Sequence, residues 1–184
     1  MDDSPPQHRR LSLASIFCLL ITVLGMLLFA LQFHGGEFIV GDDVAVGLYS
    51  FCLPNETTRE MECYSAGKMK EFNISLAAIF TARICTYTPI VLCLFALLAF
   101  LMYIYTQDKS VWALFVVMVG LSSLLLLVGI TSFLGATCHY VDVSKLSLSF
   151  FLCFSACFLL GLETIASWNF WCDQISGSNS AKRQ

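Results

Sequence analysis

The stretch LAAIFTARICTYTPIVLCLFALLAFLMYIY, residues 76–105, contains a single charged side chain, Arg83, in an otherwise predominantly apolar run. A helix needs about 20 such residues to cross a hydrocarbon core about 30 Å thick. Hydrophobic residues make up 58% of the chain and charged residues only 12%, which is outside the balance of a water-soluble domain. Three further stretches are long enough to cross, so the sequence predicts an all-α membrane protein, a four-transmembrane-helix bundle in one domain (1–184) with spans at 11–33, 76–105, 111–134 and 146–171.

The longest polar segment is the loop at residues 34–75, between the first two predicted spans. It holds seven acidic and three basic residues and two sequons, at Asn55 and Asn73. Sequons accept glycans only on the lumenal or extracellular side. We therefore predict that this loop lies outside the cytosol and that both termini are cytosolic, in a multi-pass protein of the plasma membrane or an endomembrane. The nearly balanced Lys and Arg counts permit this orientation without deciding it.

Two short runs in this outer loop have the pattern of a β-hairpin. Residues 44–53 and 60–64 flank a turn that contains Pro54 and Asn55. Cys52 and Cys63 would face each other across such a hairpin. A disulfide is the favoured state in an oxidising compartment, and two free thiols are the alternative. A bridge that closes a loop of this size stabilises the fold by about 3 kcal/mol on the chain-entropy estimate.

The other cysteines are interpreted by their position in the chain. Those inside the predicted spans are expected to pack as small hydrophobic residues. Cys172, beside Trp171 at the cytosolic end of the fourth span, is a candidate for reversible palmitoylation. Cys138, in the second outer loop, is either a free thiol or part of an intermolecular bridge. The histidines and cysteines form no ligand motif, so we predict no metal site.

Arg83 and Glu163 are ionisable residues inside the predicted spans, where charge is costly and tends to mark ion paths or internal pairs. At about 1.5 Å per residue, the two lie at different depths, so we do not expect a direct pair. Arg83 is expected to reach outward and hold backbone carbonyls or acidic groups of the outer loop. Glu163 either carries a proton or hydrogen-bonds to Ser or Thr of a neighbouring helix.

The fourth span repeats small residues at intervals of four, namely Ser149, Cys153, Cys157 and Gly161. These residues share one helix face, which permits close approach of another helix of the same bundle or of a partner protein. Aromatic residues near the cytosolic boundary predict an interfacial belt, formed by Tyr103, Tyr105, Trp112, Trp168 and Trp171.

The outer loop and the second span together carry a motif of Gly-Leu-Trp, two cysteines and an arginine, with tyrosine here in place of tryptophan. The corresponding residues are Gly47, Leu48, Tyr49, Cys52, Cys63 and Arg83. On these residues the chain resembles the claudin and peripheral myelin protein superfamily. The resemblance implies a left-handed four-helix bundle under a small extracellular β-sheet, with Cys52 bonded to Cys63 and Arg83 near the outer end of its helix.

A narrower resemblance rests on four strings: VGLYSFCLPNETTREMEC, TARICTY, LCLF and DKSVWALFVVMVGLSSLLL. In order and spacing they are similar to the transmembrane protein 140 family, over roughly residues 44–134. That family has no established reaction, so the resemblance implies kinship without a mechanism.

Enzyme chemistry has little support, because the three histidines are scattered and no nucleophile motif or glycine-rich phosphate loop is present. The net charge of −3 argues against a nucleic-acid surface, and no cofactor or small-molecule substrate is indicated. We expect a non-enzymatic protein of the lipid bilayer that acts by lateral or extracellular contacts with a membrane-protein partner or a second copy of itself. Its role would be adhesion, membrane organisation or regulation of a partner. The alternative is a channel or transporter subunit that uses Glu163 and the acidic outer loop.

Overall fold

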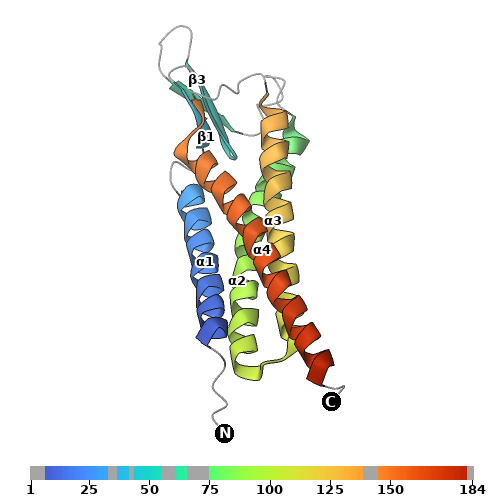
Figure 1. Ribbon diagram of the computed structural model, residues 1–184. Helices are drawn as coiled ribbons and strands as arrows, with labels where there is room; N and C mark the ends of the chain where they lie inside the picture. Colours follow the sequence, from blue (N-terminus) through green and yellow to red (C-terminus); the bar gives the residue numbers. More distant parts are fainter. Residues whose placement is uncertain are drawn as a thin grey trace.

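The computed structural model describes residues 7–32, 37–41, 44–54, 61–65, 75–138 and 145–181. In these residues the helices are α1 (Gln7–Gln32), α2 (Leu76–Thr106), α3 (Lys109–Ala136) and α4 (Leu148–Ala181). The strands are β1 (Glu37–Val40), β2 (Ala45–Gly47), β3 (Ser50–Pro54) and β4 (Met61–Ser65). The strands lie together at one end of the helix bundle, here called the sheet end (Figure 1). The opposite end carries the connection between α2 and α3 and is called the turn end.

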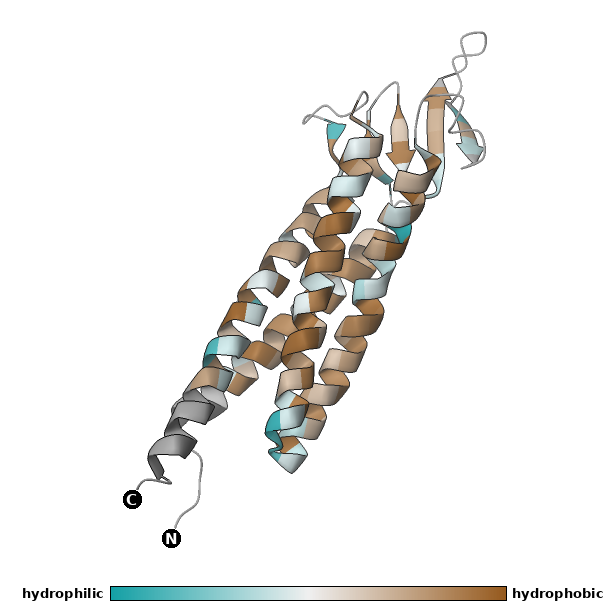
Figure 2. Cartoon of the chain, turned by 90° about the vertical axis from the view of Figure 1, so that its right-hand side faces the viewer, coloured by the Kyte–Doolittle hydropathy of each residue, from teal (hydrophilic) through white to brown (hydrophobic). Residues whose placement is uncertain are grey.

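All four helices contain a segment that is long and apolar enough to cross a membrane. The segments are Ser12–Gln32, Leu76–Thr106, Lys109–Ala136 and Leu148–Cys172. Each boundary falls within two residues of the predicted span. At the turn end α1 begins at Gln7 and α4 ends at Ala181. Apolar residues dominate the helices between the two ends of the bundle (Figure 2).

A two-residue turn joins α2 to α3. The N–H of Gln107 donates to the Tyr103 carbonyl at 2.8 Å, and Gln107 adopts a left-handed φ of 53°, which is a common way to end a helix. The carboxylate of Asp108 then accepts a hydrogen bond from the N–H of Ser110 at 2.9 Å and caps α3. Such a short connection makes α2 and α3 antiparallel neighbours.

α2 and α3 approach each other closely at Gly129. A Cβ atom at this position would lie 2.9 Å from the Thr86 hydroxyl oxygen and 3.2 Å from the carbonyl carbon of Cys85. Thr86 is itself fixed, because its hydroxyl donates to the Ala82 carbonyl at 2.6 Å. Any larger residue at Gly129 would therefore push against the backbone of α2.

The small-residue face of α4 is used inside this bundle. Ser149 and Cys153 are buried. The hydroxyl of Ser123 on α3 donates to the Cys157 carbonyl at 3.3 Å, and a Cβ at Gly161 would lie 3.6 Å from the same hydroxyl oxygen. Of the two alternatives left by the sequence, these contacts match packing within the same chain.

The sheet is antiparallel with strand order β1-β2-β3-β4. The predicted hairpin corresponds to β3 and β4, in which Cys52 pairs with Cys63. The prediction of one continuous strand over residues 44–53 is wrong, because the chain folds back at Leu48 and Tyr49 and divides this run into β2 and β3. β1, which pairs with β2, has no counterpart among the predicted strands. The domain is thus mostly helical with a small four-stranded sheet.

β1 connects the sheet to the bundle. The N–H of Ser147, just before α4, donates to the Phe38 carbonyl at 2.9 Å, and its hydroxyl donates to the Glu37 carbonyl at 2.6 Å. The ring of Phe38 is fully buried, with its centroid 5.0 Å from that of Phe133 and 6.2 Å from that of Phe150. The sheet is therefore joined to both α3 and α4.

Trp112 fills the core at the turn end. Its side chain is fully buried, and its indole N–H donates to the Ser167 carbonyl at 3.2 Å. Three ring centroids lie within 5.1 Å of its own, those of Tyr103, Phe115 and Phe170. The predicted interfacial belt is therefore wrong for Trp112 and Tyr103, which face the core, whereas Trp168 and Tyr105 are exposed.

Candidate functional site

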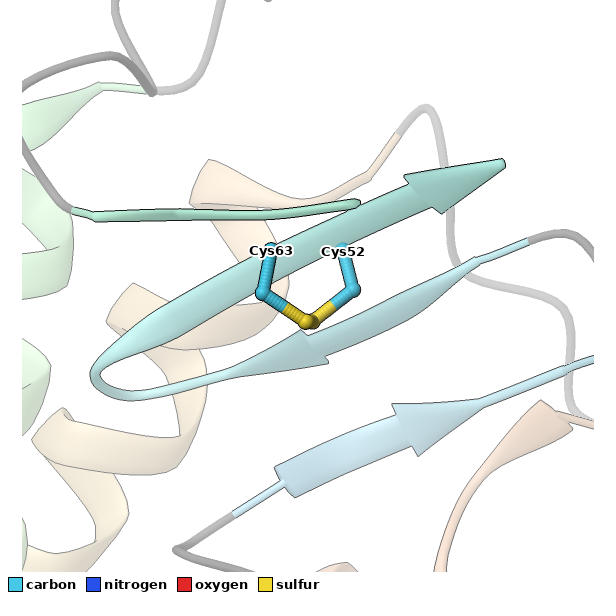
Figure 3. The surroundings of a disulfide bond; sticks show 2 residues. All are labelled: Cys52 and Cys63. Carbon is cyan, nitrogen blue, oxygen red and sulfur yellow. A yellow bond between two sulfur atoms is a disulfide. The ribbon is translucent and has the colours of Figure 1, made fainter. Parts of the chain in front are cut away.

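A disulfide joins the two strands farthest from β1. Cys52 on β3 and Cys63 on β4 are bonded (Figure 3), with their Cα atoms 4.0 Å apart. The two residues are also direct partners in the strand register. The predicted bond is confirmed. It fixes the register of the edge strand β4, which otherwise depends on a few backbone hydrogen bonds and could slip.

Arg83 connects α2 to the sheet end. Its Nε donates a hydrogen bond to the carbonyl oxygen of Leu48, whose side chain is fully buried. Its guanidinium carbon lies 4.7 Å from the centroid of the Tyr49 ring, within the range of a cation–π contact. Its Nη2 is buried without a hydrogen-bond partner in the part of the chain that the structure describes. Arg83 thus reaches a backbone carbonyl of the segment between α1 and α2, as expected from the sequence.

Tyr49 is fixed by two residues of α2 yet remains accessible. Besides the Arg83 contact, its ring meets that of Tyr87 edge to face, with the centroids 5.9 Å apart. The side chain of Tyr49 is still 49% exposed. Exposed aromatic side chains that are held in one orientation lose little freedom on binding, and such residues often dominate protein interfaces. Leu48, Tyr49, Arg83 and Tyr87 therefore form one cluster. Gly47, at the end of β2, directly precedes Leu48.

Glu163 lies apart from this cluster, inside the bundle. Its side chain is fully buried, and neither carboxyl oxygen has a hydrogen-bond partner among the described residues. The hydroxyl of Ser167, one turn further along α4, is buried and unpartnered within the same set. The expected hydrogen bond from a Ser or Thr of another helix is thus not found. An ionised carboxylate without a partner is costly in hydrocarbon.

The remaining predicted site residues lie neither in the cluster around Arg83 nor beside Glu163. Cys172 is exposed towards the turn end, and Cys138 is exposed just beyond α3. Asn55 and Asn73 lie outside the described residues. Across the described ranges, no group of three or more His, Cys, Asp or Glu side chains could hold a metal ion. The contacts that bring predicted residues together are therefore those at the sheet end.

Four helices that are long and apolar enough to cross a membrane, with a small disulfide-bonded sheet between α1 and α2, indicate a multi-pass integral membrane protein. The model of the TM140 protein family matches residues 5–179. Because the match spans nearly the whole chain, the protein belongs to the TM140 protein family. This extends the resemblance seen in the sequence over residues 44–134 to α1 and α4.

Neither Tyr87 nor the contact between Phe38 and Ser147 was identified from the sequence. Tyr87 could have been found, because it follows Arg83 by four residues and therefore lies on the same face of α2. The contact of Phe38 and Ser147 had no local signal. Those residues belong to segments more than a hundred positions apart in the chain, and only the folded bundle brings them together.

Proposed function

We propose that this TM140 family member is a non-enzymatic, claudin-like membrane protein that acts through lateral or extracellular protein contacts. Its role would be adhesion, membrane organisation or the regulation of a partner, which is another membrane protein or a second copy of the chain. The surface proposed to make the contact is the part of the sheet end that presents Tyr49. The observation that carries the proposal is that Tyr49 is half exposed while Arg83 and Tyr87 hold its ring.

The order of this surface before binding supports the proposal. The Cys52–Cys63 bond ties β4 to β3, and Ser147 ties β1 to the start of α4. Association is opposed by the conformational entropy that each partner loses. A surface whose strands and aromatic side chain are already fixed loses less, so a small contact area can give useful affinity.

The orientation that suits this function places the sheet end outside the cytosol and both termini in the cytosol. The disulfide supports it, because such bonds persist in oxidising compartments. The sequons at Asn55 and Asn73 share the segment that carries the bond, and we propose that they carry glycans. The host bilayer would be the plasma membrane or an endomembrane. Cys172, at the other end of the molecule, would then be accessible to cytosolic palmitoylation.

Proximity labelling of the full chain in living cells tests the contact surface. Tyr49→Ala removes the held ring, whereas Val40→Ala removes an apolar side chain of similar exposure, 47%, on the edge strand β1. We expect Tyr49→Ala to lose a defined set of neighbours that the wild type and Val40→Ala both retain. Surface delivery and the disulfide are checked in each variant. An unchanged neighbour set for a correctly delivered Tyr49→Ala would contradict the proposal.

A channel or transporter subunit is the second candidate, supported by the buried carboxyl of Glu163, which has no hydrogen-bond partner in the described part of the chain. Ion or proton flux into liposomes that contain the purified chain separates the two functions. We expect no selective flux. A selective flux that Glu163→Gln abolishes would overturn the contact function in favour of transport.

A further inference from the structure

A groove of about 330 Å³ opens between α1 and α2 near the turn end. The rings of Phe17 and Phe100 stack in it with their centroids 5.8 Å apart. Phe100 is buried, whereas Ala14, Leu101 and Ile104 are exposed. The groove therefore has an aromatic base and an open apolar side, and its lining residues are Leu13, Ala14, Phe17, Phe100, Leu101 and Ile104.

The position of the groove identifies the chemistry of its occupant. Its α1 side lies in the first turns of the segment Ser12–Gln32, and its α2 side lies in the last turns of Leu76–Thr106, both candidate membrane spans. The groove thus opens sideways at the edge of the hydrocarbon layer. Its size is at the lower end of the range for ligand pockets, and its apolar wall suits one acyl chain of a lipid.

The charge beside the groove selects among lipids. Arg9 and Arg10 precede Leu13 and Ala14 by four residues, one helical turn closer to the turn end of α1. The first turn of α1 contains no acidic residue. Lys109 is exposed at the start of α3 at the same end, and the nearby Asp108 carboxylate caps that helix. Basic residues at the level of the headgroups attract anionic lipids.

We propose that this groove binds an anionic phospholipid of the leaflet at the turn end. One acyl chain lies against Phe17 and Phe100, and the headgroup lies at the level of Arg9 and Arg10. The site is at the opposite end of the molecule from Tyr49. It therefore does not depend on the proposed protein contact, and either proposal can fail without the other.

Photolabelling of the full chain in nanodiscs tests the headgroup preference. The probes are phosphatidylserine and phosphatidylcholine, each with a diazirine in the acyl chain, and the labelled positions are mapped by mass spectrometry. We expect phosphatidylserine to label the residues around Phe17 and Ile104 at least fivefold more than phosphatidylcholine, because one basic residue near the surface contributes roughly that factor. The double variant Arg9→Gln, Arg10→Gln should lose most of this preference. The double lysine variant keeps the charge and should keep the preference.

The groove itself is tested by Ala14→Trp, which fills it from the exposed side. Ile21→Trp is the matched control, because Ile21 is 46% exposed on the same helix but does not line the groove. We expect Ala14→Trp to remove most labelling and Ile21→Trp to leave it unchanged. Should Ala14→Trp fail to fold, the arginine variants still decide the outcome.

Equal labelling by both lipids in the wild type, or labelling unchanged in the double glutamine variant, would overturn the proposal. A photoreactive group at position 14 that joins two copies of the chain would assign the groove to a protein instead.

Discussion

The contact between Arg83 and Tyr49 can be tested by removing the guanidinium. Arg83→Met keeps an unbranched apolar side chain but loses the charged hydrogen bond to the Leu48 carbonyl, which contributes about 1.5–3 kcal/mol. It also loses the cation–π contact with the Tyr49 ring, about 0.5–1 kcal/mol at an exposed site. Against these losses, the variant removes the buried Nη2 that has no partner in the described residues, whose desolvation costs about 1–3 kcal/mol. The central values leave a net loss of about 1 kcal/mol in the free energy of unfolding.

A double-mutant cycle isolates the ring contact, because the desolvation of Nη2 is common to both arms and cancels. The free energy of unfolding is measured by denaturant titration in bicelles for the wild type, Arg83→Met, Tyr49→Ala and the double variant. We expect a coupling of about 0.5–1 kcal/mol.

Tyr105→Ala is the control partner for this cycle. Tyr105 is 91% exposed, and it lies on the same helix about 33 Å along the axis from Arg83 at the usual helical rise. Its effect should add to that of Arg83→Met. A coupling below about 0.3 kcal/mol between Arg83 and Tyr49 would refute the reasoning.

Three further perturbations follow from the structure. Cys52→Ser and Cys63→Ser should each lower the free energy of unfolding by about 3 kcal/mol and the double variant by no more, as measured by denaturant titration; clearly unequal single variants would argue against one shared bond. Glu163→Gln should change the free energy of unfolding by less than about 1 kcal/mol, because no described hydrogen-bond partner is lost. Glu163→Leu should raise the free energy of unfolding by about 1–3 kcal/mol, because it removes a buried polar group. A large loss of stability in Glu163→Gln would reveal a partner of the carboxyl group. Gly129→Ala should lower the free energy of unfolding by about 1–3 kcal/mol, and with it the melting temperature, because the added Cβ overpacks against α2. Gly135→Ala on the same helix should leave the melting temperature unchanged, because a Cβ there meets no described atom within 4 Å. Similar melting temperatures for the two variants would contradict the close approach of α2 and α3.

The positions of the spans were predictable, because bilayer thickness sets the length of each apolar run. The side of each helix that faces the core was not predictable. Lipid-facing and core-facing residues are both apolar in a membrane bundle, so the periodicity that reveals the buried face of a soluble helix is weak here. Trp112 and Tyr103 illustrate this, since their place near the end of a span suggested an interfacial position and the structure buries them.

At the sheet end, the sequence indicated the contacts that depend on local pattern. Cys52 and Cys63 stand on either side of a turn signal, and Arg83 is a charge that must find polar partners. The break at Leu48, which separates β2 from β3, had no such local signal. The Leu48 carbonyl accepts a hydrogen bond from Arg83 of α2, which is distant in the sequence. Likewise, sequence can place Glu163 inside a span but cannot show which neighbours its oxygens meet.

We infer that the sheet end is ordered before it meets any partner, because the Cys52–Cys63 bond ties β4 to β3. This bond is tested most directly by alkylating free thiols in native membranes and mapping the cysteines of the full chain by mass spectrometry. We predict that Cys52 and Cys63 are recovered in one disulfide-linked pair of peptides. Recovery of both residues as alkylated free thiols would contradict it.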